Sequence, residues 1–64
     1  MDPADPTTEA ARRANAEGLA ALRAGDGAAA TRAFGVATAA DPQAGALWRN
    51  LAHAHRLTRD AGAE

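Results

Sequence analysis

The chain has 64 residues, a formal net charge of −1 and no cysteine, so it can form one small domain but neither a disulfide framework nor a thiolate metal site. It has no apolar run long enough for a signal peptide or a membrane span, and we expect a cytoplasmic location. Alanine supplies most of the 47% apolar content and no segment alternates with period two, which predicts an all-α fold.

Large apolar side chains are few, so the core must be small and rich in alanine. The candidates are Leu19, Leu22, Phe34, Val36, Leu47, Trp48, Leu51 and Leu57. A chain of this length buries only about 60% of the surface that its unfolded form exposes. We therefore expect marginal stability, or help from a neighbour. The alanine excess, with seven arginines and no lysine, indicates a GC-rich bacterial genome.

Three segments are expected along the chain. Residues 1–6 hold two Asp-Pro pairs, which predict an irregular lead-in. Residues 7–60 are expected to form a helical module, and residues 61–64 a frayed tail. The first helix can start at Asp5-Pro6, or at Thr7 or Thr8, because Asp and Thr are good N-caps and Pro suits the first helical position. It should run to about residue 24 and end at Gly25 in a left-handed conformation.

Asp26 predicts the N-cap of a second helix, with Gly27 to Ala40 as its body. Gly35 lies mid-helix and costs about 1 kcal/mol relative to alanine. It marks either a close approach to another helix or a position without a structural role.

Asp41-Pro42 repeats the start signal and predicts a third helix over about residues 43–58, with residues 59–64 fraying. Spacings of one, three and four predict its buried stripe, which comprises Leu47, Trp48, Leu51 and Ala52. On this interpretation Trp48 is a core residue, and Trp48→Ala should unfold the chain, since such truncations cost about 3–5 kcal/mol.

The spacing of these residues fits two successive registers that start 34 residues apart. If Ala11 is the first position of a unit, the signature positions hold Gly18, Ala30, Phe34, Ala37 and Pro42. The next unit then starts at Gly45 and has Trp48 and Leu51 on two further signature positions. This pattern resembles the tetratricopeptide repeat (TPR), a helix–turn–helix unit of about 34 residues. The resemblance implies three antiparallel helices, as one full repeat plus the first helix of a second, and a role in binding other proteins.

Each signature residue has an expected packing role. Small residues at 18, 30 and 52 should let helices approach closely, Phe34 and Trp48 should fill the space left open, and Ala37 should lie where the next helix crosses. The first helix departs from the family pattern at Ala14, Glu17 and Ala21, as the third does at His55; terminal repeats are often atypical.

The resemblance also implies a ligand groove lined by the first helix of each repeat. By position, its residues are Arg12, Asn15, Leu19, Leu22, Arg49, Asn50, His53 and Arg56. A subset of the family clamps a C-terminal carboxylate of chaperones. Asn50 matches one clamp position, but Asn15 stands where lysine is needed and Leu19 where asparagine is needed, so this clamp is not predicted.

Arg49, His53 and Arg56 share one helix face at spacings of four and three. They either contact an acidic peptide or a carboxylate through charge-assisted hydrogen bonds, or form a solvated face that keeps the helix soluble.

We expect neither a metal site nor a catalytic one. His53 and His55 lie about 200° apart on a helix and cannot readily share a metal. No acid–base pair, phosphate-binding loop or nucleophile motif is visible, so the sequence predicts no enzymatic activity and no cofactor. It also predicts no nucleic-acid partner, because the third helix has three arginines but only one aromatic residue, Trp48, which is expected to be buried.

The leading hypothesis is therefore a protein–protein interaction module that binds a peptide or helix of a partner. Two alternatives stay open. The segment can be the N-terminal accessory part of a longer bacterial enzyme, such as one resembling aspartyl/asparaginyl hydroxylases, or a self-associating mini-protein in which a second copy covers the third helix.

Overall fold

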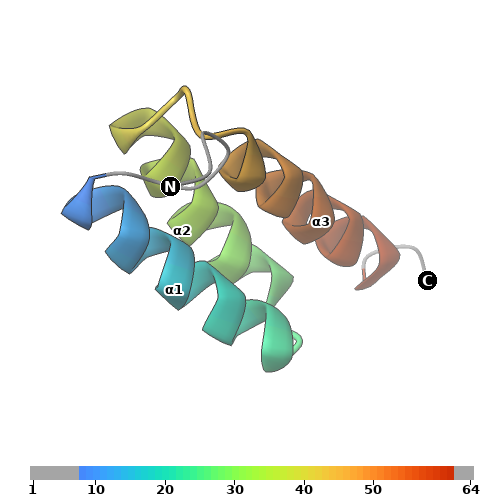
Figure 1. Ribbon diagram of the computed structural model, residues 1–64. Coiled ribbons are helices and arrows are strands. Elements are labelled where there is room, and N and C mark those ends of the chain that lie inside the picture. Colours follow the sequence, from blue (N-terminus) through green and yellow to red (C-terminus); the bar gives the residue numbers. More distant parts are fainter. Residues whose placement is uncertain (1–7, 62–64) are drawn as a thin grey trace.

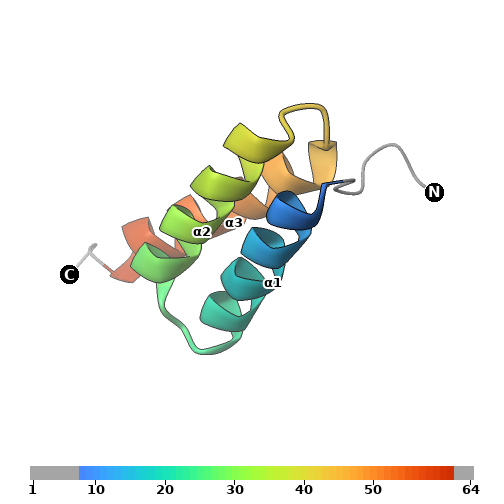
Figure 2. The same ribbon diagram turned by 90° about the vertical axis from the view of Figure 1, so that its left-hand side faces the viewer.

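The computed structural model describes residues 8–61, which form three α-helices joined by short turns (Figure 1). They are α1 (Glu9–Arg23), α2 (Gly27–Ala40) and α3 (Gly45–Ala61). The helix α2 packs against both others, whereas α1 and α3 contact each other less (Figures 1 and 2). The predicted all-α fold is confirmed. The predicted lead-in over residues 1–6, and residues 62–64 of the predicted tail, lie outside the described residues.

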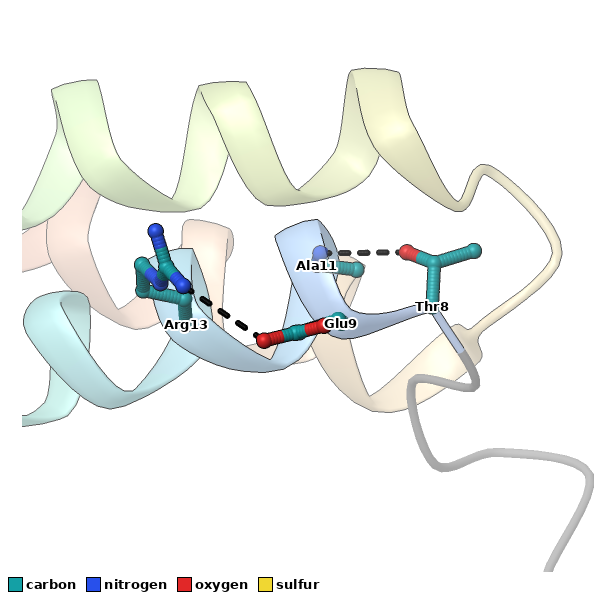
Figure 3. Close-up of polar contacts among 4 residues, drawn as sticks. All are labelled: Thr8, Glu9, Ala11 and Arg13. Atoms are coloured by element: carbon teal, nitrogen blue, oxygen red, sulfur yellow. Dashed lines mark hydrogen bonds and ion pairs between the residues drawn. The ribbon is translucent and has the colours of Figure 1, made fainter.

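A side-chain cap starts α1. The hydroxyl of Thr8 accepts a hydrogen bond of 3.0 Å from the backbone N–H of Ala11, as an N-cap residue does (Figure 3). Glu9 lies in the first turn, where the helix dipole favours an anion, and its carboxylate lies 3.5 Å from the guanidinium of Arg13. That ion pair is exposed and contributes little. Of the predicted start positions, Thr8 is the one that caps the helix.

The turn from α1 to α2 is fixed by two backbone hydrogen bonds. Gly25 has a φ of +77° and its N–H donates to the carbonyl of Leu22, while the N–H of Asp26 donates to Ala21. This is the Schellman arrangement, which needs a left-handed residue at the position of Gly25. The carboxylate of Asp26 then accepts from the N–H of Ala29 at 3.0 Å and caps α2. Both predictions for this turn are confirmed.

Phe34 fills the space that Gly18 leaves open. Its side chain is fully buried, and a Cβ added at Gly18 would lie 2.5–2.7 Å from three atoms of the ring. Ala30 and Ala54 complete this cluster of buried residues. Partly buried hydrophobic residues pack around it; they are Leu19, Ala21, Leu22 and Leu51. The close approach predicted from the small residues at 18 and 30 is therefore confirmed.

A second cluster lies where the other ends of the helices meet. Leu47 of α3 is fully buried there among four alanines: Ala11, Ala14, Ala37 and Ala44. Because alanine side chains are short, the three helices can approach closely around one leucine. The predicted role of Ala37, at the point where the next helix crosses, is confirmed.

The helix α3 begins later and ends later than its sequence predicted. Asp41 ends α2, because its N–H donates to Ala37 at 3.0 Å. The Asp41 carbonyl then accepts from Ala44, so Asp41-Pro42 forms the turn itself. The first residue of α3 is Gly45, and the helix continues to Ala61 rather than fraying from Arg59.

The predicted buried stripe of α3 is partly wrong. Leu47 is buried and Leu51 half-buried, but Ala52 is exposed and Trp48 is 48% exposed. The buried face instead runs through Ala44, Leu47 and Ala54. Each residue turns a helix by 100°, so with Leu47 facing α2 the neighbouring Trp48 points to the side. Its indole Nε1 donates to the carbonyl of Pro42 at 2.9 Å, which holds the ring against the turn.

Trp48→Ala should therefore lower the free energy of unfolding by no more than about 1–2 kcal/mol, because half of the ring is in water and one hydrogen bond is lost. Urea unfolding followed by circular dichroism measures this loss. Trp48→Phe, which keeps an aromatic ring but loses the indole N–H, should fall between Trp48→Ala and the parent. A loss above 3 kcal/mol for Trp48→Ala, as for a buried tryptophan, would refute the exposed placement.

Two glycines of α2 should respond oppositely to the same substitution. A Cβ at Gly27 would lie 2.6 Å from the hydroxyl and 2.9 Å from the backbone nitrogen of Thr58 on α3, whereas a Cβ at Gly35 would meet nothing within 4 Å. We expect Gly35→Ala to stabilise the chain by up to about 1 kcal/mol, and Gly27→Ala to destabilise it by about 1–3 kcal/mol. Thermal melts of the pair test this, and equal shifts in the same direction would contradict the tight contact at Gly27.

Candidate functional site

One hydrogen bond ties the two helices that the family resemblance assigns to the groove. The side-chain nitrogen Nδ2 of Asn50 on α3 donates to Oδ1 of Asn15 on α1 at 2.9 Å. Both side chains are half-buried, and such a bond contributes about 0.5–1.5 kcal/mol. The bond fixes the orientation of both amides. One N–H of Asn50 and Oδ1 of Asn15 are used, while the Asn15 N–H group and the Asn50 oxygen keep capacity for another partner.

The α1 members of the predicted groove set have different surroundings. Leu19 and Leu22 are half-buried because they pack against the cluster around Phe34. Arg12 is exposed at the surface, while Asn15 faces α3 through its bond to Asn50. The leucines therefore belong partly to the core, and an apolar strip of α1 stays in reach of a ligand.

The α3 members lie on two sides of their helix. Asn50 faces α1, whereas Arg49, His53 and Arg56 are exposed and, together with Ala52, line an open hollow of about 220 Å³. At 100° per residue, these four lie roughly opposite the buried Leu47 and Ala54. We call this surface, defined by Arg49, Ala52, His53 and Arg56, the outer flank of α3. It borders the face shared by α1 and α3, because His53 lies three residues after Asn50.

The outer flank is cationic, and the nearest acidic residue along α3 is Asp60, one turn after Arg56. No Asp or Glu occurs between Gly45 and Arg59. Within residues 8–61, neither arginine of the flank nor His53 has an ion pair or hydrogen bond to another side chain. Sequence reasoning found these three residues by their spacing. Sequence reasoning assigned Ala52 to the core and therefore missed it as the short residue that lies between them.

Metal-binding groups are sparse in the described part of the chain. His53 and His55 are both exposed, and no group of three or more His, Asp or Glu residues among residues 8–61 is placed to hold a metal ion. The described helices include none that is both long and apolar enough to cross a membrane.

Comparison of the chain with models of protein families, with curated proteins and with solved structures gives no match.

Proposed function

We propose that the chain is a protein–protein interaction module of tetratricopeptide type, and that it binds a peptide or helix of a partner on the face shared by α1 and α3. The bond between Asn15 and Asn50 carries this proposal, because it aligns the two helices side by side with their remaining amide groups free to meet a peptide backbone. The packing of Phe34 on Gly18 supports it, since this contact falls on two signature positions of the repeat.

The face offers the mixed chemistry that a peptide needs. The half-buried Leu19 and Leu22 supply apolar area, and the paired asparagines supply donors and acceptors. Peptide ligands commonly gain affinity from main-chain hydrogen bonds and specificity from pockets for side chains. We expect a short peptide to lie along α1 and α3 and to contact both helices.

The test is selection of peptides from a random displayed library on the full chain, followed by ¹⁵N-resolved NMR of a selected peptide. The proposal expects the largest chemical-shift changes at Asn15, Leu22 and Asn50. The outer side of α2, at Arg32 and the 60% exposed Val36, is the internal control and should not change. Failure to select any peptide, or shifts confined to that side of α2, would reject the proposal.

Self-association is a second candidate, favoured by one observation. Trp48 is half-exposed, and Ala52, one turn later on the same helix, is exposed. No other helix within residues 8–61 covers them. A large exposed aromatic residue is a frequent anchor of protein interfaces. Under this candidate a second copy would cover Trp48, so Trp48→Arg should turn an oligomer into a monomer. Sedimentation equilibrium of the parent chain and of the Trp48→Arg variant tests whether the chain self-associates through this residue.

A further inference from the structure

The outer flank of α3 has a geometry that suits anionic side chains. Its two arginines are seven residues apart, which separates them by roughly 10 Å along the helix axis. His53 stands between them, three residues from one and four from the other, and Ala52 leaves the hollow open at its centre. Every long side chain around the hollow therefore ends in a nitrogen-bearing group.

Carboxylates match this surface better than other ligands do. Arginine presents a planar fork of N–H donors that fits a carboxylate bidentately. Alternate residues of an extended peptide are about 6.6 Å apart, and residues three apart about 10 Å apart. Acidic side chains spaced by two or three residues can thus reach Arg49 and Arg56 together, while the Ala52 methyl group contacts the chain between them.

A nucleic acid is the less suitable polyanion. Such ligands favour an extended basic surface with aromatic side chains for stacking. The chain as a whole has a net charge of −1, and the two arginines and one histidine of the flank have a single exposed aromatic neighbour, Trp48, rather than a series of them.

We propose that the outer flank of α3 is a docking site for an acidic segment of a partner protein, held by its carboxylates against Arg49, His53 and Arg56. This inference rests on the proposed interaction function and adds to it a second surface with a defined ligand chemistry. The flank adjoins the Asn15–Asn50 pair on one side, since His53 lies one turn after Asn50, whereas Arg56 lies about 120° from Asn50 around the helix.

The experiment uses acetylated, amidated hexaglutamate as the probe and hexaglutamine as its uncharged counterpart, added to the full chain at constant ionic strength. Trp48, one turn before Ala52, reports binding by fluorescence, and ¹⁵N-resolved NMR locates it. Hexaglutamate should bind and shift the signals of Arg49, Ala52, His53 and Arg56, whereas hexaglutamine should not. Equal binding of both peptides, or shifts located elsewhere, would overturn the proposal.

Matched variants separate the site from bulk charge. Arg49→Gln and Arg56→Gln should each weaken hexaglutamate binding about three- to tenfold, as expected for loss of one charge-assisted contact. Arg32→Gln on α2 removes the same charge from another exposed position and should leave binding unchanged. Ala52→Leu fills the hollow without touching the core and should also weaken binding. An equal loss in Arg32→Gln would show attraction to net charge alone and refute the site.

The outcomes also distinguish this inference from the function it rests on. If hexathymidylate binds as tightly as hexaglutamate with the same shifts, the surface recognises any polyanion and the acidic-protein proposal fails. If hexaglutamate does not bind while library-selected peptides still shift Asn15 and Asn50, the flank proposal fails and the interaction function stands. If no selected peptide binds the α1–α3 face, the proposed function fails whatever hexaglutamate does.

Discussion

Phe34→Ala is expected to leave most of the chain unfolded at 25 °C. Phe34 and Leu47 are the largest fully buried side chains among residues 8–61, and the rest of the buried core is mostly alanine. Truncating a buried phenylalanine typically costs about 3–5 kcal/mol. Native stability amounts to about 0.05–0.15 kcal/mol per residue, so a domain of this size has little beyond that loss. Circular dichroism at 222 nm should show a large loss of helix.

Two controls identify the cause of that loss. Phe34→Leu keeps most of the buried volume and should retain a cooperative melt at a lower temperature. Val36→Ala, two residues along the same helix, removes an exposed side chain and should change stability by less than about 0.5 kcal/mol. A Phe34→Ala protein that melts within a few degrees of the parent would show that the cluster around Phe34 does not hold the helices together.

Gly18→Ala should destabilise the chain by about 1–3 kcal/mol, the usual cost of inserting a methyl group into a packed core. The new Cβ would lie 2.5–2.7 Å from three atoms of the Phe34 ring, so the ring or α1 must move. Helix propensity alone predicts the opposite sign, because alanine is favoured over glycine by about 1 kcal/mol within a helix. Urea unfolding therefore separates packing from propensity by the sign of the change.

A double substitution tests the contact itself. Combined with Phe34→Leu, Gly18→Ala should cost much less than it does alone, because the smaller side chain leaves room for the methyl group. Residues in contact typically show coupling energies of about 0.5–3 kcal/mol. Strict additivity of the two substitutions would mean that Gly18 and Phe34 do not meet in solution.

Local signals predicted much of the fold. Gly25 and Asp26 predicted the first turn correctly, because a left-handed backbone and a helix cap depend on only a few neighbouring residues. The 34-residue spacing predicted that Phe34 would pack on small residues, and Gly18 and Ala30 lie there.

The rotation of α3 could not be predicted in the same way. Its sequence offers two overlapping apolar stripes, one through Trp48 and Ala52 and one through Ala44, Leu47 and Ala54. Contacts with α1 and α2 select the second, because two alanines and one leucine fit a close helix approach and an indole does not. The repeat signature favoured the first stripe, and that interpretation was wrong for Trp48.

Two long-range contacts could also not be predicted from the sequence. Gly27 meets Thr58, and Asn15 meets Asn50, across separations of 31 and 35 residues. Neither residue pair has a local signal, since each depends on how α3 lies against the hairpin. The candidate surfaces were found as residue sets, but their division between the α1–α3 face and the outer flank follows only from the rotation of α3.

The most direct test of the account is sedimentation equilibrium of the full chain over a concentration series, with circular dichroism and Trp48 fluorescence on the same samples. We expect a helical monomer at every concentration, with emission typical of a half-exposed indole, so that both candidate surfaces are free to meet another protein. Mass and helicity that rise together, with emission shifting to the blue, would contradict it and make self-assembly through the Trp48 side of α3 the function to pursue.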